Sequence, residues 1–90
     1  MTSRIVDENE KVCYLCGGYG SDRHHCLHGS MRAKCEEDGL VVMLCRTCHR
    51  NLHDHRINDL YLQQLAERFW LDYTGNTVQD FIDRYGKNFL

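Results

Sequence analysis

Two Cys-x-x-Cys pairs constrain this chain more than any other feature of its sequence. Cys13 and Cys16 form the first pair, Cys45 and Cys48 form the second, and 28 residues lie between them. Each pair offers two thiolates from one tight turn, and four thiolates complete the tetrahedral shell of a structural zinc ion. Buried or redox-active cysteines are the alternative, but two such pairs in a short chain favour a metal. The sequence therefore predicts one zinc site that joins two distant segments.

A metal cross-link suits a chain of this size. A chain of 90 residues buries only about 60–65% of its unfolded surface, so its core needs support. The N-terminal segment turns acidic at Asp7 and Glu8 and shows no apolar core of a signal peptide. No apolar run approaches the ~18 residues of a membrane span. We therefore expect a cytoplasmic protein without a membrane partner, in which reduced cysteines are free to bind zinc.

Two pairs of histidines accompany the cysteines. His24 and His25 are adjacent, so on a strand they point to opposite faces unless the strand twists. His49 and His53 are four residues apart, so on a helix both imidazoles project from one face and can share a metal ion. The remaining cysteines and histidines belong to neither pattern. We expect the cysteines to be small packed or partly exposed thiols and the histidines to be ordinary solvated imidazoles, and these residues are Cys26, Cys35, His28 and His55.

The hydrophobic pattern of the first half predicts a hairpin. Residues 1–12 are expected to be loose or weakly paired, and residues 24–28 to form a short strand. Residues 30–39 are polar and charged, which predicts a loop. The apolar run from Leu40 to Leu44 predicts a buried strand that ends at the second cysteine pair.

The second half predicts helices. The pattern becomes helical at Arg46 and stays so through about His53. A second helix is expected from Asn58 or Asp59 to about Tyr73, and a third follows a capping box at residues 77–80 and runs through about residue 84. We expect the last two helices to cover the hairpin with apolar side chains at helical spacing, and these are Leu60, Tyr61, Leu65, Phe69, Trp70, Phe81 and Ile82.

The charge of the chain does not by itself indicate a nucleic-acid-binding protein. The formal net charge is −2, which gives no overall attraction to a polyanion. Positive residues near the histidines form a patch of the size of a single site, not a binding stripe. They are Arg23, Arg32, Lys34, Arg46, Arg50 and Arg56.

The combined motifs resemble those of the HNH (ββα-metal) endonucleases. The resemblance covers residues 13 to about 54 and rests on His24-His25, on the run Leu-Cys-Arg-Thr-Cys-His at residues 44–49, and on His53. The 25-residue step from His24 to His49 resembles that of the bacterial nuclease toxins of this superfamily. The run Cys-Tyr-Leu-Cys-Gly-Gly and the ending Tyr-Gly-Lys-Asn-Phe-Leu are similar to the small HNH proteins of phages and prophages.

This resemblance implies an α+β domain over residues 1–90, with a zinc-stapled ββα-metal core at residues 13–54 and a helical extension at residues 57–90. It implies metal-dependent hydrolysis of DNA phosphodiester bonds, by nicking or cleavage, in phage or mobile-element DNA processing in the cytoplasm of a bacterial host. The catalytic divalent ion would be Mg²⁺, Mn²⁺, Ni²⁺, Co²⁺ or Zn²⁺, and imidazole ligands favour the transition metals.

The resemblance also implies roles for individual residues. His25 would be the general base that takes a proton from water. His24 and His49 would hold the catalytic ion, and His53 would be a further ligand or a phosphate contact. Arg32 would meet the DNA backbone. From the local charge pattern, Lys34, Arg46 and Arg50 are further candidates for contact with DNA.

The chain departs from the family at one position. The middle Asn, which supports the catalytic loop, should fall near the start of the second strand, where this chain has Glu37-Asp38-Gly39-Leu40. Either Asp38 substitutes for it, or Gly39 lets the loop close without support. If the site is inactive, the alternatives are a zinc module that binds nucleic acid without cleaving it and an inhibitor that binds a host protein through the C-terminal helices.

Overall fold

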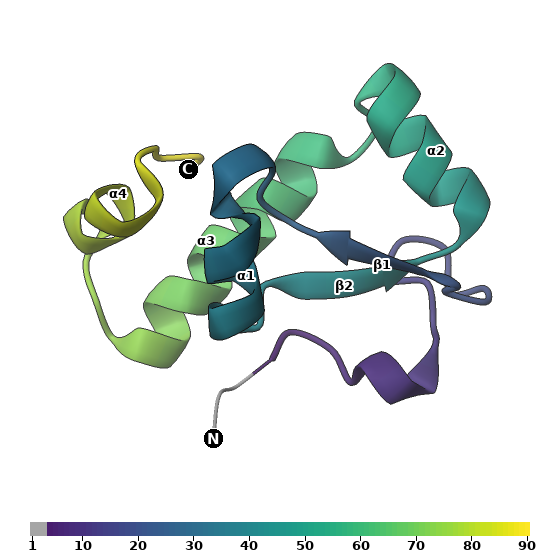
Figure 1. Cartoon of the computed structure of the whole chain (residues 1–90), viewed down its shortest axis with the longest axis horizontal. Coiled ribbons are helices and arrows are strands. Elements are labelled where there is room, and N and C mark those ends of the chain that lie inside the picture. The colour runs from purple at the N-terminus through teal and green to yellow at the C-terminus, as the bar shows by residue number, and fades with distance from the viewer. Residues whose placement is uncertain (1–3) are drawn as a thin grey trace.

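Two antiparallel strands and four α-helices form an α+β fold in residues 4–90, which are the residues that the computed structural model describes (Figure 1). Strand β1 (Asp22–His25) pairs with β2 (Val41–Leu44), with Asp22 opposite Leu44 and His25 opposite Val41. All four residues of β2 are buried, which explains its uninterrupted apolar sequence. The α+β prediction is confirmed. Of residues 1–12, the first three lie outside the described part, and residues 8–10 form a 3-10 helix.

The polar segment between the strands is helical, so the prediction of a loop at residues 30–39 is wrong. A 3-10 turn (Gly29–Met31) leads into α1 (Arg32–Asp38). Cys35 is the one fully buried residue of this helix, and Gly39 ends it in the left-handed conformation with φ of 72°. Because a two-turn helix with a single buried residue shows no clear amphipathic period, its polarity resembles that of a loop. Strand β1 also begins and ends earlier than the predicted range 24–28.

Helix α2 (Arg46–His55) begins directly after β2. Cys45 caps it, because its Sγ accepts a hydrogen bond from the backbone N–H of Cys48 at 3.4 Å. The helix ends at Arg56, which has a left-handed backbone with φ of 58°. The prediction of a helix through His53 is therefore confirmed, and the helix continues for two more residues.

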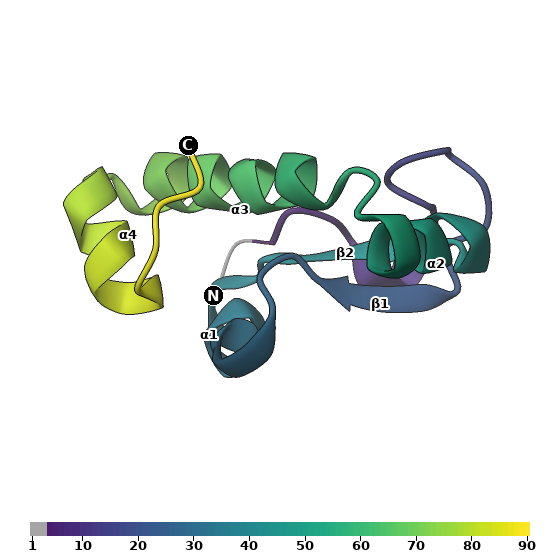
Figure 2. The same cartoon turned by 90° about the horizontal axis from the view of Figure 1, so that it is seen from above.

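Helices α3 (Asp59–Thr74) and α4 (Val78–Tyr85) form the C-terminal part, and the predicted capping box of Thr77 and Asp80 is present. Figure 2 shows α3 on one side of the strands and α1 on the other. Helix α4 lies beyond the strands, beside α1, where the Arg84 guanidinium contacts Asp38 at 2.7 Å. The expectation that both C-terminal helices cover the hairpin is therefore wrong for α4. No helix among residues 4–90 is long and apolar enough to cross a membrane.

Helix α3 buries a different face from the predicted one. Leu62 and Ala66 are fully buried and Trp70 is nearly so, whereas Leu60 and Tyr61 are 56% and 50% exposed. The last two were expected in the core, and this is a correction. The other expected core residues of α3 and α4 are at least partly buried, and these are Leu65, Phe69, Trp70, Phe81 and Ile82.

Candidate metal centre

The four cysteines of the two pairs meet in space, and we call them the thiolate cluster. Their Sγ atoms all lie within 4.8 Å of one another, and those of Cys16 and Cys45 are 3.7 Å apart. A tetrahedral ion with Zn–S bonds of ~2.3 Å separates its sulfurs by about 3.8 Å, so this spacing fits a metal ion. The cluster Cys13, Cys16, Cys45 and Cys48 is thus compatible with a structural metal site.

Local backbone geometry prepares the first pair for a metal. Gly17 has a left-handed backbone with φ of 79°, and this turn lets the Cys13 N–H donate to the carbonyl of Gly18 at 2.7 Å. Burial opposes ionisation of Cys13, but backbone N–H groups of Cys45, Cys16 and Leu15 outweigh it and lower its pKa to about 6. The thiolate is the form that binds metals, so this environment favours ligation by Cys13. In the metal-free cluster, the hydrogen bond from the Gly18 backbone is outweighed by those with Cys13 and Cys45, which raise the pKa of Cys16. Burial, together with the other thiols, raises the pKa of Cys48.

The two remaining cysteines lie in the core, as expected. Cys26 and Cys35 are fully buried. Burial raises the pKa of both thiols, that of Cys35 to about 11, so they stay protonated and pack as small apolar side chains.

Three histidines from two elements form a second group, the histidine cluster: His24 of β1 with His49 and His53 of α2. Their ligand atoms lie within 4.8 Å of one another, and the ring centroids of His24 are 5.2 Å from His49 and 5.7 Å from His53. His24 is buried, and its Nε2 has no hydrogen-bond partner among residues 4–90. Such an atom costs free energy when left unpaired. A metal ion would satisfy it, so the donor set fits a divalent cation.

The cluster is also electrostatically suited to a cation. Burial, together with the neighbouring imidazoles of His49, His28 and His53, lowers the pKa of His24 to about 3. Burial, then His49, also lowers the pKa of His53. Both rings therefore stay neutral at physiological pH, and the neutral imidazole is the form that binds metals.

A carboxylate orients one ring of the cluster. The Nδ1 of His49 lies 3.0 Å from Oδ2 of Asp22, so the Nδ1–H donates a hydrogen bond to this carboxylate, and the Nε2 faces Nε2 of His53 at 3.0 Å. The hydrogen bond from His49 lowers the pKa of Asp22. The sequence interpretation missed Asp22, although it lies two residues before His24 and therefore shares a face of the strand with it.

His25 lines the same cavity as the histidine cluster. The cavity has a volume of about 100 Å³ and is bounded by Arg23, His24, His25, His28, Arg32, His49 and His53. The sequence places the two side chains on opposite faces unless the strand twists, and in the structure both line one cavity.

His28 belongs to this site, which corrects the expectation of an ordinary solvated side chain. Its Nε2 lies 2.6 Å from Oδ1 of Asp59, and its ring centroid lies 5.5 Å from that of His24. Asp59 is 5% exposed and also accepts a hydrogen bond from Arg56 at 3.1 Å. Neither His28 nor Asp59 belongs to a recognisable sequence pattern, so this pair could not have been found from spacing.

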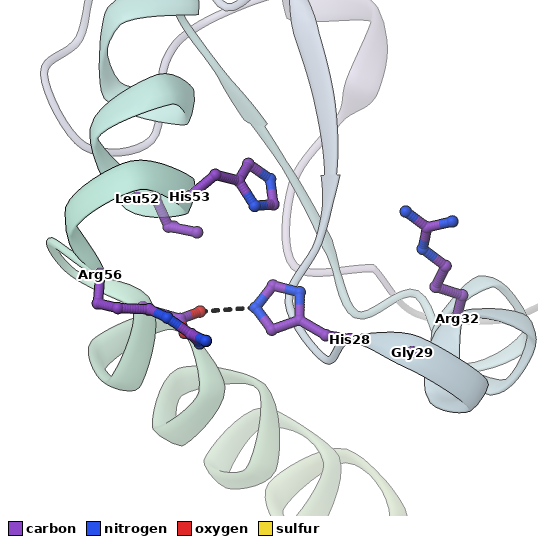
Figure 3. Close-up of a pocket in the computed structure, with 7 residues that line it drawn as sticks. His28, Gly29, Arg32, Leu52, His53 and Arg56 are labelled. Carbon is purple, nitrogen blue, oxygen red and sulfur yellow. Dashed lines mark hydrogen bonds and ion pairs between the residues drawn. The ribbon is translucent and has the colours of Figure 1, made fainter.

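A second cavity of about 300 Å³ adjoins the first and shares His28, Arg32 and His53 with it. In Figure 3 the rings of His28 and His53 both point into this cavity, and the dashed line marks the contact between His28 and Asp59. Helix α2 and the start of α1 form its walls. We call these two adjacent cavities together the groove beside the histidine cluster.

The predicted DNA-contacting residues lie in different places. Arg32 lines both cavities. Arg46 and Arg50 are exposed on α2, and Arg46 lies 3.8 Å from Asp22. Lys34 instead donates to the carbonyl of Arg84 at 2.5 Å, on the side of α1 that faces α4. The structure therefore places Arg32 at the cavity of the histidine cluster and Lys34 against α4.

Asp38, a candidate substitute for the absent Asn, contacts helix α4. Its carboxylate accepts hydrogen bonds from Arg84, at 2.7 Å and 3.0 Å, and from the Tyr85 hydroxyl. These contacts attach α4 to α1, and none of the contacts that the structure records for Asp38 within residues 4–90 joins it to His25.

Comparison of the chain with protein-family models, with curated proteins and with solved structures finds no match. Function is therefore inferred from the residues and their geometry.

Proposed function

We propose that this protein is a metal-dependent endonuclease that hydrolyses DNA phosphodiester bonds, with the residue roles of an HNH (ββα-metal) nuclease. One observation carries the proposal: His24, His49 and His53 converge within 4.8 Å, and His25 lines the same cavity. The order of elements supports it, because an antiparallel hairpin is followed directly by the helix that carries the last two histidines.

The thiolate cluster is proposed to hold a structural zinc ion. Four thiolates form a closed shell, which is typical of structural sites. Two of them lie at the junction of β2 and α2, and His49 follows Cys48 directly. Zinc at this point would fix the start of α2 relative to the strands, and the helix would then hold His49 and His53 against His24.

The histidine cluster is proposed to hold the catalytic divalent ion. Three protein ligands leave positions open for water or phosphate, as in catalytic metal sites. When bound, the ion would stabilise charge on the phosphoryl oxygens and the leaving oxygen. Asp22 keeps the metal-facing nitrogen of His49 unprotonated, and His25 accepts the proton of the attacking water.

The groove beside the cluster supports a polyanionic substrate. Arg32 lines both cavities, and Arg46 and Arg50 are exposed on the helix that carries the ligands. Arginines in such positions bind backbone phosphates without reading the sequence. The setting would be phage or mobile-element DNA processing in a bacterial cytoplasm.

Nicking of a supercoiled plasmid in a series of Mg²⁺, Mn²⁺, Co²⁺, Ni²⁺ and Zn²⁺ tests the proposal. His25→Ala should lower the rate by about 10²–10⁴-fold with little change in DNA affinity, because the loss falls on proton transfer. His55→Ala is the matched control, since His55 is exposed on the same helix as His49 and lines neither cavity. If the wild type binds DNA with a steep salt dependence but nicks with none of these ions, the non-catalytic zinc module is the better description.

A further inference from the structure

We propose that Glu36 is a positioning residue for His25, and that its carboxylate holds the imidazole in the tautomer that a general base requires. This inference rests on the proposed role of His25 as the base. It assigns to α1 the support that the absent Asn would otherwise supply. The observation that carries it is the contact of 2.7 Å between Nε2 of His25 and Oε1 of Glu36.

The chemistry of this contact determines where the proton of His25 lies. An ionised carboxylate can only accept hydrogen bonds, so the Nε2 of a neutral His25 must carry the proton and donate it. The lone pair of the neutral ring then lies on Nδ1. His25 lines the cavity beside the histidine cluster, so Nδ1 is the nitrogen left to accept a proton from water there. Free rotation of the ring would lose this arrangement.

Arg23 holds the Glu36 carboxylate in place. Its Nη2 donates to Oε2 of Glu36 at 2.7 Å, and its Nη1 donates to Oε1, so the guanidinium binds both oxygens. Bidentate pairs of this kind restrict the carboxylate in orientation as well as position. The guanidinium also holds the pKa of Glu36 at about 2, which keeps the carboxylate ionised at neutral pH. Arg23 and His25 are two residues apart on β1, so both side chains lie on one face of the strand and meet the same carboxylate.

The alternative is that Glu36 is only the partner of Arg23 in a partly exposed ion pair. Such a pair would contribute little to the stability of the fold and nothing to the orientation of His25. Two neighbouring acids separate these roles. Glu8 also pairs with Arg23 but has no contact with His25 among those that the structure records. Glu37 follows Glu36 on α1 and pairs with Arg84 at 2.8 Å. Glu8→Gln therefore weakens the ion pairs of Glu8 with Arg23 and with Arg4 and leaves the contact of Glu36 with His25 in place. Glu37→Gln removes a charge from the same helix as Glu36.

The experiment compares the wild type with Glu36→Ala, Glu36→Gln, Glu8→Gln and Glu37→Gln, all as the zinc-loaded full chain. The first measurement is imidazole NMR of protein labelled with ¹⁵N-histidine, at about pH 8, where an ordinary histidine is neutral. We expect an exchange-protected Nε2–H proton of His25 in the wild type and in both control variants, and its loss in Glu36→Ala. A proton that stays protected in Glu36→Ala, or that is lost equally in Glu37→Gln, overturns the proposal.

The second measurement is plasmid nicking together with DNA affinity. Glu36→Ala should nick about 10- to 100-fold more slowly at unchanged affinity, as is typical when the partner of a functional histidine is removed. Glu36→Gln keeps an acceptor oxygen and should retain an intermediate rate. If the wild type nicks and Glu36→Ala is equally fast, the positioning role fails while the nuclease proposal stands. If the wild type does not nick, both fail, and a protected Nε2–H then marks a structural contact only.

Discussion

Binding of a second divalent ion to the histidine cluster should raise the melting temperature of the protein. The Nε2 of His24 is buried without a partner among residues 4–90, and an unpaired buried polar atom costs about 1–3 kcal/mol. An ion held by His24, His49 and His53 removes this cost. It should bind the folded chain in preference to the unfolded one, because β1 and α2 bring together ligands that lie 25 residues apart in sequence.

The expected shift follows from linkage. A free Ni²⁺ concentration about 100 times Kd adds about 2.7 kcal/mol to the free energy of unfolding. For a chain of 90 residues, each kcal/mol raises Tm by about 4–8 °C, so the increase should be about 10–20 °C. The assay is scanning calorimetry of the protein with its structural zinc in place, with and without Ni²⁺. We expect the full shift in the wild type and in His55→Ala, and none in His49→Ala.

Two results would refute this reasoning. An equal Ni²⁺-dependent shift in His49→Ala would mean that the ion binds elsewhere on the protein. Loss of zinc from His49→Ala, measured by elemental analysis, would mean that His49 is a ligand of the thiolate cluster and that the two sites are not separate. The structure predicts that His49→Ala retains one zinc ion per chain, because the four sulfurs already complete a tetrahedral shell.

Three further predictions concern folding, packing and pH. Chelation of the structural zinc should abolish cooperative thermal unfolding, since metal binding and folding are coupled; a sharp transition in the metal-free protein would contradict this. Leu62→Ala should lower the free energy of unfolding by about 2–5 kcal/mol, because Leu62 is fully buried. Leu60→Ala should lower it by about 0.5 kcal/mol or less, because Leu60 is 56% exposed. Equal losses in urea unfolding would mean that the buried face of α3 is assigned wrongly. The pKa of His24 is lowered to about 3, and that of His53 is also lowered. Protons therefore compete with the metal ion for these two rings at a lower pH than they would for an ordinary imidazole. The affinity for Ni²⁺, measured by titration calorimetry, should change little between about pH 8 and pH 7. A tenfold loss over that range would contradict it.

The elements that could be predicted are those with a local signature. The cysteine pairs, the apolar run of β2 and the i, i+4 histidines of α2 depend only on residues close in sequence. The buried face of α3 could not be predicted in this way. Arg56 and Asn58, both with left-handed backbones at φ of 58° and 65°, set the direction in which the chain leaves α2 and enters α3. Because non-glycine residues seldom adopt this conformation, the sequence does not indicate it.

The candidate site likewise contains some residues that local sequence patterns indicate and others that they do not. The metal-binding residue types are visible in the sequence, but three carboxylates that orient imidazoles come from separate elements: Asp22 from β1, Glu36 from α1 and Asp59 from α3. Glu36 and Glu37 show why spacing alone could not identify them. They are neighbours of the same residue type on one helix, yet Glu36 contacts His25 and Glu37 contacts Arg84. Successive side chains on a helix point about 100° apart. Helix α1, which the sequence did not predict, therefore determines that Glu36 and not Glu37 contacts the proposed base.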